Sequence, residues 1–240
     1  MRLALAALVV AFAAVQSVFG VGLLVFGTPA LLLLGLPFEQ VLAYLLPCSI
    51  VISFLQVRVG GFGLDAVRRK ILLLTAPAVL AGTVVILWAG HKLDVRAVVG
   101  AMLVVTAGTR LLGSVRRVVE SVVRRELSPL LVLLGLVHGL SNLGGGILAL
   151  IMGSLYEPKE DIRRQIAFTY GLMASIQLGT LFVTTSVGIE WGLWALLPLL
   201  AGATFLAVGQ RLFRAAGESL YQLGLTGLIL AFGVLLLLAP

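Results

Sequence analysis

Residues 136–150 read LVHGLSNLGGGILAL, and the expected architecture of the whole chain follows from this segment. An apolar run long enough to enter a lipid bilayer is interrupted at its middle by Gly144, Gly145 and Gly146. One histidine, one serine and one asparagine precede the glycines. Glycine loosens a helix, and hydrocarbon offers no hydrogen-bond partner to the backbone groups that a break sets free. The segment therefore predicts a broken helix at membrane depth, which is where secondary transporters hold their substrates.

The composition is that of an integral membrane protein. Of the 240 residues, 60% are apolar and 11% are charged, and the mean hydropathy is +1.16, well outside the range of soluble domains. Apolar runs of about 20 residues recur, which is the length of a helix that crosses a bilayer. The basic residues behind the net charge of +7 lie in short loops between these runs, so they indicate membrane topology and not nucleic-acid binding. Cys48, the only cysteine, is expected to be an apolar filler.

The hydrophobic segments divide the chain into two halves. We expect a first repeat over residues 1–113, a cytoplasmic amphipathic linker over residues 114–128, and a second repeat over residues 129–240. Each repeat would begin with a broken segment, the first one interrupted at Gly27, Thr28 and Pro29, and would continue with three plain spans. The eight segments are expected over residues 3–36, 38–57, 71–89, 95–113, 129–156, 162–187, 191–208 and 220–238.

The two halves keep the same order of special residues, although few residues are identical. The aligned pairs are Gly27 with Gly145, Glu39 with Glu160, residues 47–49 with residues 168–170, and Gln56 with Gln177. An insertion of three residues separates the first pair from the others. We therefore expect an internal repeat in which each half is built in the same way.

The distribution of Lys and Arg favours one of two topologies. If all eight segments cross the membrane once, the 17 basic residues divide ten against seven. If the first and fifth segments instead enter and return, Arg2, Lys92 and Arg96 lie on one side and the other fourteen on the opposite side. Cytoplasmic loops carry the excess of Lys and Arg, so the second topology is preferred. The expected fold is therefore an all-α integral membrane protein with two inverted repeats, each a broken or re-entrant helical hairpin followed by three transmembrane helices.

The acidic residues argue against catalysis. All ten Asp and Glu residues fall in loops or at segment ends under this topology. A proton pump or cation transporter usually keeps a carboxylate inside the membrane, and a metalloenzyme needs clustered His, Asp or Glu. The sequence has neither pattern, and it lacks the HExxH, GxSxG and Walker motifs. We therefore expect a protein that is not an enzyme and uses no metal or cofactor.

The polar groups left at membrane depth are neutral and rich in hydrogen-bond donors. A helix that restarts after Gly146 or after Pro29 would turn unsatisfied amides and the positive end of its dipole toward a cavity, where they suit an anion. The expected substrate-binding residues are Gly27, Thr28, Pro29, Ser49, Gln56, His138, Ser141, Asn142, Gly144, Gly145, Gly146, Thr169, Tyr170 and Gln177. Two alternatives stay open. Small residues also allow close helix packing, and His138 could either couple a proton to transport or serve as a neutral packing residue.

Three glycine-rich and proline-rich stretches resemble the sulfite exporter TauE/SafE family of membrane transporters. They are FGVG at 19–22, GTPALLLLGLP at 27–37 and HGLSNLGGGILAL at 138–150, and the resemblance covers essentially the whole chain. The family's first half usually carries its own glycine cluster, where this chain has GLLVFGTP at 22–29. The resemblance implies export of small sulfur-containing anions, such as sulfite, sulfoacetate or other organosulfonates, across a bacterial inner membrane.

The leading hypothesis is a secondary transporter whose two inverted halves rock about an anion site between the two breaks. The loops rich in Lys and Arg would be cytoplasmic and both termini would lie on the opposite side. The expected partners are a small anion and the lipid bilayer, with no nucleic acid. No motif specifies a coupled proton or ion, or a homodimer, and both stay open. A membrane scaffold or assembly subunit, an anion channel and an enzyme acting on a lipid-borne substrate are the alternatives.

Overall fold

The computed structural model describes residues 1–60, 65–89, 97, 99–101, 104, 121–123, 125–215, 234 and 238. Within this part of the chain every regular element is a helix and none is a strand, which confirms the expected all-α class there. Five helical runs among the described residues are long and apolar enough to cross a membrane. They are Arg2–Phe19, Phe38–Arg58, Ala66–Ala89, Lys159–Thr184 and Trp191–Gly209.

The first half begins with two helices separated by a short break. Helix α1 (Arg2–Phe19) ends at Gly20, whose φ of 73° is a left-handed conformation that glycine adopts without strain. Helix α2 (Leu23–Leu33) starts three residues later, and helix α3 (Phe38–Gly60) follows. Helix α4 (Ala66–Lys70) begins where the side chain of Asp65 accepts a hydrogen bond from the amide of Arg68, and it continues through a π-helical turn, Ile71–Thr75, into α5 (Ala76–Ala89).

The second half has the same order of elements. Helix α8 (Leu127–Ser141) ends at Asn142, and helix α9 (Gly145–Leu155) starts after a break of three residues. Helix α10 (Lys159–Thr184) is the longest helix described. Helix α11 (Trp191–Thr204) runs through a π-helical turn, Phe205–Gly209, into α12 (Gln210–Ala215).

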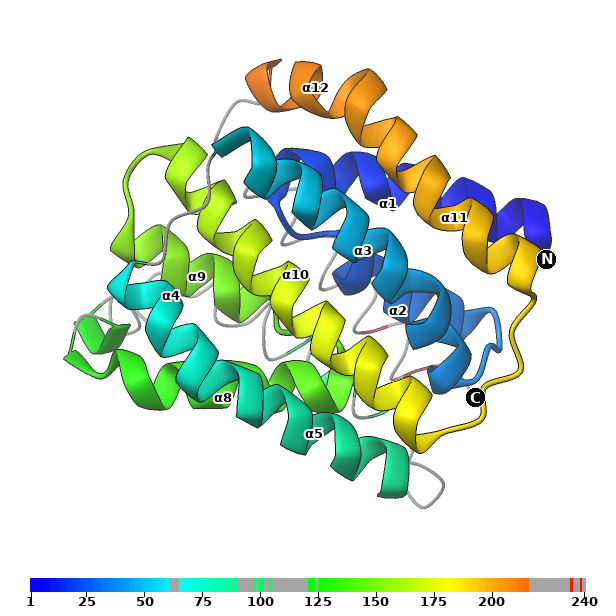
Figure 1. Ribbon diagram of the computed structural model, residues 1–240, viewed down its shortest axis with the longest axis horizontal. Coiled ribbons are helices and arrows are strands. Elements are labelled where there is room, and N and C mark those ends of the chain that lie inside the picture. The colour runs from blue at the N-terminus through cyan, green and yellow to red at the C-terminus, as the bar shows by residue number, and fades with distance from the viewer. Residues whose placement is uncertain are drawn as a thin grey trace.

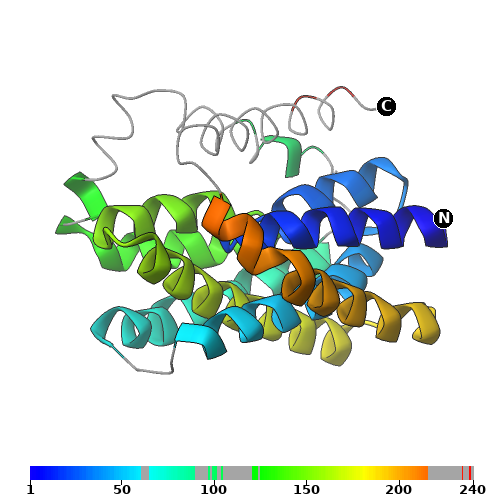
Figure 2. The same ribbon diagram turned by 90° about the horizontal axis from the view of Figure 1, so that it is seen from above.

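The long helices α3 and α10 form the centre of the molecule. They pack against each other and run in opposite directions (Figure 1). Helix α5 packs on α8 and α10, while α11 packs on α1 and α3. Most helices lie along the long horizontal axis of the molecule, as the view from above also shows (Figure 2).

Each pair of short helices forms a hairpin. In Figure 1, α1 runs from the N-terminus at the right toward the middle, and α2 returns toward the right. Helix α8 runs from the left toward the middle, and α9 returns to the left. We call the first break residues 20–22 and the second break residues 142–144. Both breaks lie inside the bundle, and the two hairpins contact each other through α2 and α9.

The structure corrects the position of the first break. Gly27, Thr28 and Pro29 lie inside α2 and do not interrupt a helix. The interruption is at Gly20 and Gly22, whose φ angles of 73° and 151° require glycine. The break residues then align Gly22 with Gly144, the residues that precede α2 and α9, in place of Gly27 with Gly145.

Small residues allow α5 and α8 to pack with their backbones close together. A Cβ atom on Gly135 would lie 2.6 Å from the carbonyl oxygen of Thr75, and one on Gly139 would lie 2.5 Å from that of Val79. The hydroxyl of Thr75, in the π-helical turn, donates to the carbonyl of Leu131. The glycines at these positions therefore act through packing, which is the common role of small residues between membrane helices.

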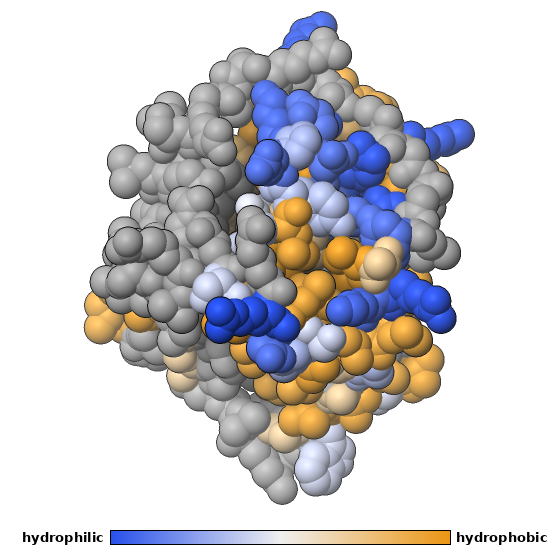
Figure 3. Space-filling model, turned by 90° about the vertical axis from the view of Figure 1, so that its left-hand side faces the viewer, coloured by the Kyte–Doolittle hydropathy of each residue, from blue (hydrophilic) through white to orange (hydrophobic). Residues whose placement is uncertain are grey.

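The two ends of the molecule differ in charge. We call the end where α9 finishes and α10 begins the α10 end, and the opposite one the α1 end. Figure 3 looks at the α10 end, where hydrophilic side chains cover much of the described surface. The exposed basic residues on elements that begin or finish there include Arg58, Arg69, Lys70, Arg125 and Lys159. The expected segments 95–113 and 220–238 lie outside the described residues except for isolated positions, as does the first part of the linker 114–128.

Candidate functional site

The second break begins with a residue in the left-handed conformation, and the helix that follows it starts with two glycines. Asn142 has φ 62°, a conformation that asparagine tolerates better than most residues, and its amide bonds to the carbonyl of His138 at 2.7 Å. The first backbone bond of α9 runs from Leu148 to the carbonyl of Gly144 at 2.9 Å. The amides of Gly145 and Gly146 therefore have no partner among the described residues, and both glycines are buried.

Side chains of α8 bind the amides within the break itself. The hydroxyl of Ser141 accepts from the amide of Leu143 at 3.3 Å, and Nδ1 of His138 accepts from the amide of Gly144 at 3.2 Å. Because Nδ1 is an acceptor in this contact, the neutral imidazole carries its proton on Nε2. His138 is fully buried, so it places an Nε2–H donor inside the bundle.

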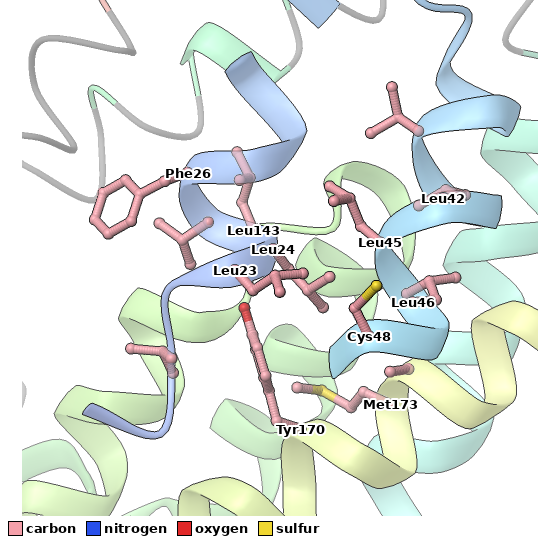
Figure 4. Packing of buried hydrophobic residues seen from close by; sticks show 14 of the residues in the cluster. Leu23, Leu24, Phe26, Leu42, Leu45, Leu46, Cys48, Leu143, Tyr170 and Met173 are labelled. Atoms are coloured by element: carbon pink, nitrogen blue, oxygen red, sulfur yellow. The ribbon is translucent and has the colours of Figure 1, made fainter. Parts of the chain in front are cut away.

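Tyr170 of α10 faces the start of α9. Its ring centroid lies 5.5 Å from that of His138, and its hydroxyl oxygen lies 2.9 Å from where a Cβ atom on Gly145 would stand. The side chains of Val21 and Val25, from the first hairpin, approach the same position at 3.2 and 2.8 Å. In Figure 4 the hydroxyl of Tyr170 points from α10 toward the start of α2. Glycine at 145 thus allows the hydroxyl of Tyr170 and the two valines to approach the backbone at the start of α9 closely.

Four buried polar atoms around the second break have no hydrogen bond within the described part of the chain. They are Nε2 of His138, Oδ1 of Asn142, the hydroxyl of Tyr170 and Oε1 of Gln177. The side chain of Gln177 interacts with the imidazole of His138, although neither Nε2 nor Oε1 has a hydrogen-bond partner within 3.5 Å among the described residues. Leaving a buried donor unpaired costs about 1–3 kcal/mol. Two side-chain donors and the amides of α9 would regain this free energy from a bound anion, with the positive end of the α9 dipole adding to it.

The first hairpin packs against the second break and makes one hydrogen bond to it. The amide nitrogen of Asn142 donates to the hydroxyl of Thr28 at 2.9 Å, so the structure brings these two predicted residues together. Gly27 instead packs against Leu45, whose Cδ1 would lie 2.9 Å from a Cβ atom there. Pro29 is buried within α2. These two residues shape the packing of α2 and are not part of the break.

Side chains of α3 hydrogen-bond to the last turns of α1, next to the first break. The amide nitrogen of Gln16 donates to the hydroxyl of Ser49 at 3.1 Å and approaches that of Ser53 at 3.5 Å. Gln56 donates to the carbonyls of Gln16 and Ser17 at 3.0 and 3.2 Å. Ser49 and Gln56 therefore belong to the first break. Sequence reasoning missed Gln16, although its position one turn before the FGVG glycines marks it.

The same backbone contact recurs at the second break. Gln177 donates to the carbonyls of His138 and Gly139 at 3.1 and 3.5 Å, as Gln56 does to those of Gln16 and Ser17. The sequence alignment of Gln56 with Gln177 thus pairs two residues with the same role. The hydroxyl of Thr169 does not bond to this cluster and instead donates to the carbonyl of Gln165 in its own helix.

The remaining polar chemistry is sparse. Among the described residues, no group of three or more His, Cys, Asp or Glu side chains is placed to hold a metal ion. Cys48 is fully buried, and its thiol donates to the carbonyl of Tyr44 one turn earlier in α3. Cys48 therefore packs within the core.

Comparison with known proteins gives one match. The family model described as Sulfite exporter TauE/SafE matches residues 3–236, nearly the whole chain. No curated protein and no solved structure matches the chain.

Proposed function

Because the chain belongs to the sulfite exporter TauE/SafE family, we propose that it is a secondary transporter that exports small sulfur-containing anions across a bacterial inner membrane. The proposed substrates are sulfite, sulfoacetate and other organosulfonates. The family is one of membrane transporters, and the described helices include five that are long and apolar enough to span a bilayer.

The observation that carries this proposal is the unpaired donor set at the second break. The amides of Gly145 and Gly146, Nε2 of His138 and the hydroxyl of Tyr170 are buried donors with no described partner. A sulfite or sulfonate group presents several oxygen acceptors and a negative charge, so it complements donors gathered at the positive end of a helix. We propose that these four residues donate hydrogen bonds to the anion. Asn142, Gln177, Val21 and Val25 would hold the backbone and side chains around them in place.

We further propose that the two halves are inverted repeats and that transport occurs by alternating access. The support is the repeated contact pattern: α3 packs on α11 as α10 packs on α5, and Gln56 and Gln177 bind equivalent carbonyls. The hairpins enter the bundle from opposite ends (Figure 1). Broken helices that meet between inverted halves are how many secondary transporters build a site that can open to either side.

The charge difference between the ends supports an orientation. We propose that the α10 end, with Arg58, Arg69, Lys70, Arg125 and Lys159 on its surface, is cytoplasmic. The N-terminus and the Arg2–Glu190 ion pair at the α1 end would then face the periplasm. Export would carry the anion from the α10 end to the α1 end.

The test is transport of radiolabelled sulfite in proteoliposomes. We expect saturable counterflow for the wild-type protein and background counterflow for Gly145→Leu, because the new side chain would meet Tyr170, Val21 and Val25. The matched control is Gly27→Ala, whose Cβ meets only the flexible end of Leu45. Wild-type liposomes at background for sulfite and for the organosulfonates would reject the function, and equal counterflow in Gly145→Leu would reject the site. Transport that does not saturate and shows no counterflow would point to a channel.

A further inference from the structure

Two polar contacts at opposite ends of the molecule occupy equivalent places in the two halves. Resting on the proposed function, we propose that they alternately close the anion site: the Asp65 contact (Asp65, Arg68, Tyr156 and Gln165) at the α10 end, and the Glu190 contact (Arg2, Tyr44 and Glu190) at the α1 end. Opening one while the other stays closed exposes the second break to one side of the membrane.

The Asp65 contact joins α10 to the start of α4. The side-chain nitrogen of Gln165 donates to Oδ2 of Asp65 at 2.6 Å, and Nε of Arg68 donates to Oε1 of Gln165 at 2.9 Å. Arg68 is only 2% exposed, and its guanidinium lies 4.7 Å from the ring centroid of Phe168. Gln165 therefore uses both ends of its amide to hold the start of α4 against α10.

Tyr156 links this contact to the anion site through α9. It follows the last residue of α9, and its hydroxyl donates to Oδ2 of Asp65 at 3.4 Å. Burial and the neighbouring Asp65 carboxylate raise the pKa of Tyr156 to about 12, so its hydroxyl stays protonated at neutral pH. The other end of α9 carries the free amides of Gly145 and Gly146. A shift of α9 on anion binding would thus move Tyr156 and change its hydrogen bond to Asp65.

The Glu190 contact joins α3 to the start of α11. The hydroxyl of Tyr44 accepts from the amide of Glu190 at 3.0 Å. The carboxylate of Glu190 pairs with Nε of Arg2 at 2.9 Å, which also ties down the start of α1. Both charged side chains are well exposed, so the bond from the Glu190 amide to the Tyr44 hydroxyl is the more important part of this contact.

The two contacts are equivalent in the repeat. Tyr44 and Gln165 are 121 positions apart, the same spacing that separates Gln56 from Gln177. Asp65 precedes α4 and Glu190 precedes α11, so each contact joins the long helix of one half to the same helix start in the other half. They lie at opposite ends because α3 and α10 run in opposite directions. A pair of this kind is what an alternating mechanism needs, since each contact restrains one opening only.

The experiment measures access to the site from each side separately. The reporter is Val25→Cys in a Cys48→Ala background, because Val25 is 2% exposed and lies against Gly145. Its labelling rate by a membrane-impermeant, sulfonate-bearing methanethiosulfonate is measured in right-side-out and inside-out vesicles. Gln165→Met removes the two hydrogen bonds that Gln165 makes in the Asp65 contact, and Tyr44→Phe removes only a hydroxyl. Thr180→Val is the control, since its hydroxyl bonds within its own helix.

We expect Gln165→Met to raise labelling from the α10 end and Tyr44→Phe to raise it from the α1 end, each by roughly 2- to 10-fold, the weight of one or two hydrogen bonds. Thr180→Val should leave both rates unchanged. Unchanged labelling in both variants, or increases from the same side, would overturn the proposal; a variant that loses its wild-type size-exclusion profile is replaced by Gln165→Ala or Tyr44→Leu. Sulfite counterflow in the same vesicles separates the two hypotheses. If the two variants shift labelling in opposite directions but the wild-type protein shows no sulfite counterflow, the proposal for the two contacts stands and sulfite is rejected as the substrate.

Discussion

The first break (residues 20–22) and the second break (residues 142–144) share a backbone plan and differ in their side chains. In each, a helix ends in a left-handed residue and a glutamine from α3 or α10 binds the last carbonyls. At the first break Gln16 bonds to Ser49. At the second break the equivalent residues, His138 and Tyr170, face each other with Nε2 and the hydroxyl unpaired.

The two helix starts also carry different side chains. Buried Leu23 and Leu24 begin α2, whereas Gly145 and Gly146 begin α9. In both helices the first backbone bond comes from the fourth residue, Phe26 to Gly22 and Leu148 to Gly144, so the two starts differ in their side chains and not in their backbone bonding. Under the proposed function, the two halves share a backbone plan while only the second break offers groups to a ligand. On that proposal, the first break contributes to stability and the second break binds the anion.

The largest difference is expected between His138→Leu and Gln16→Leu, which change equivalent positions. His138→Leu removes the Nε2–H donor and also the acceptor of the Gly144 amide. A hydrogen bond to a charged ligand contributes up to about 3 kcal/mol, and the Gly144 amide also loses its acceptor, so sulfite affinity should fall roughly 100-fold, measured by thermal-shift titration of purified protein.

Gln16→Leu leaves the hydroxyls of Ser49 and Ser53 without their partner. We expect it to lower the free energy of unfolding by about 1–3 kcal/mol and to leave sulfite affinity unchanged. Equal losses of affinity in the two variants would show that both breaks bind the anion, and the comparison would fail.

Tyr170→Phe and Ser49→Ala form a second equivalent pair, with a smaller expected effect. The hydroxyl of Tyr170 has no partner in the described structure, so removing it should not reduce stability, yet sulfite affinity should fall about 10-fold. Ser49→Ala should do the opposite, with a stability loss of about 1 kcal/mol and no change in affinity. Titrations monitored by thermal unfolding report both quantities. A stability loss in Tyr170→Phe without a change in affinity would mean that its hydroxyl has an internal partner.

Asn142 tests whether the second break needs its side chain or its backbone conformation. Asn142→Gly keeps the left-handed φ available but removes the bond to Thr28, while Asn142→Ala also adds strain. We expect Asn142→Ala to be less stable than Asn142→Gly by about 1 kcal/mol, measured by chemical unfolding. Thr28→Val should match Asn142→Gly, because each removes one partner of the same hydrogen bond. Equal stability of the alanine and glycine variants would contradict the strain argument.

The second break was predicted close to its position because Asn142 and the glycines lie near one another in the chain. The interruption was expected at Gly144, Gly145 and Gly146, but it covers residues 142–144, and Gly145 and Gly146 begin α9. The first break was placed wrongly at Gly27–Pro29, since a Gly-Thr-Pro sequence usually ends a helix. In the structure Gly27 provides room for Leu45, and the positive φ angles fall on Gly20 and Gly22. Packing against another helix and backbone φ cannot be read from composition. The partnership of Gln16 with Ser49 was also hidden, because it joins residues of two helices that sequence alone does not bring together.

Gln56 and Gln177 should show the smallest difference, because here the two breaks are the same. Each donates to carbonyls at the end of a broken helix, and each has an unpaired Oε1. Methionine has a similar shape and no donor, so Gln56→Met and Gln177→Met should each lower the free energy of unfolding by about 1 kcal/mol. Thermal and chemical unfolding of both variants would measure this. Gln177→Met should in addition weaken sulfite binding slightly, because it loosens the backbone that orients His138. A much larger stability loss in Gln56→Met alone would mean that the glutamine bond stabilises the first break more than the second. The two breaks would then not share one backbone plan.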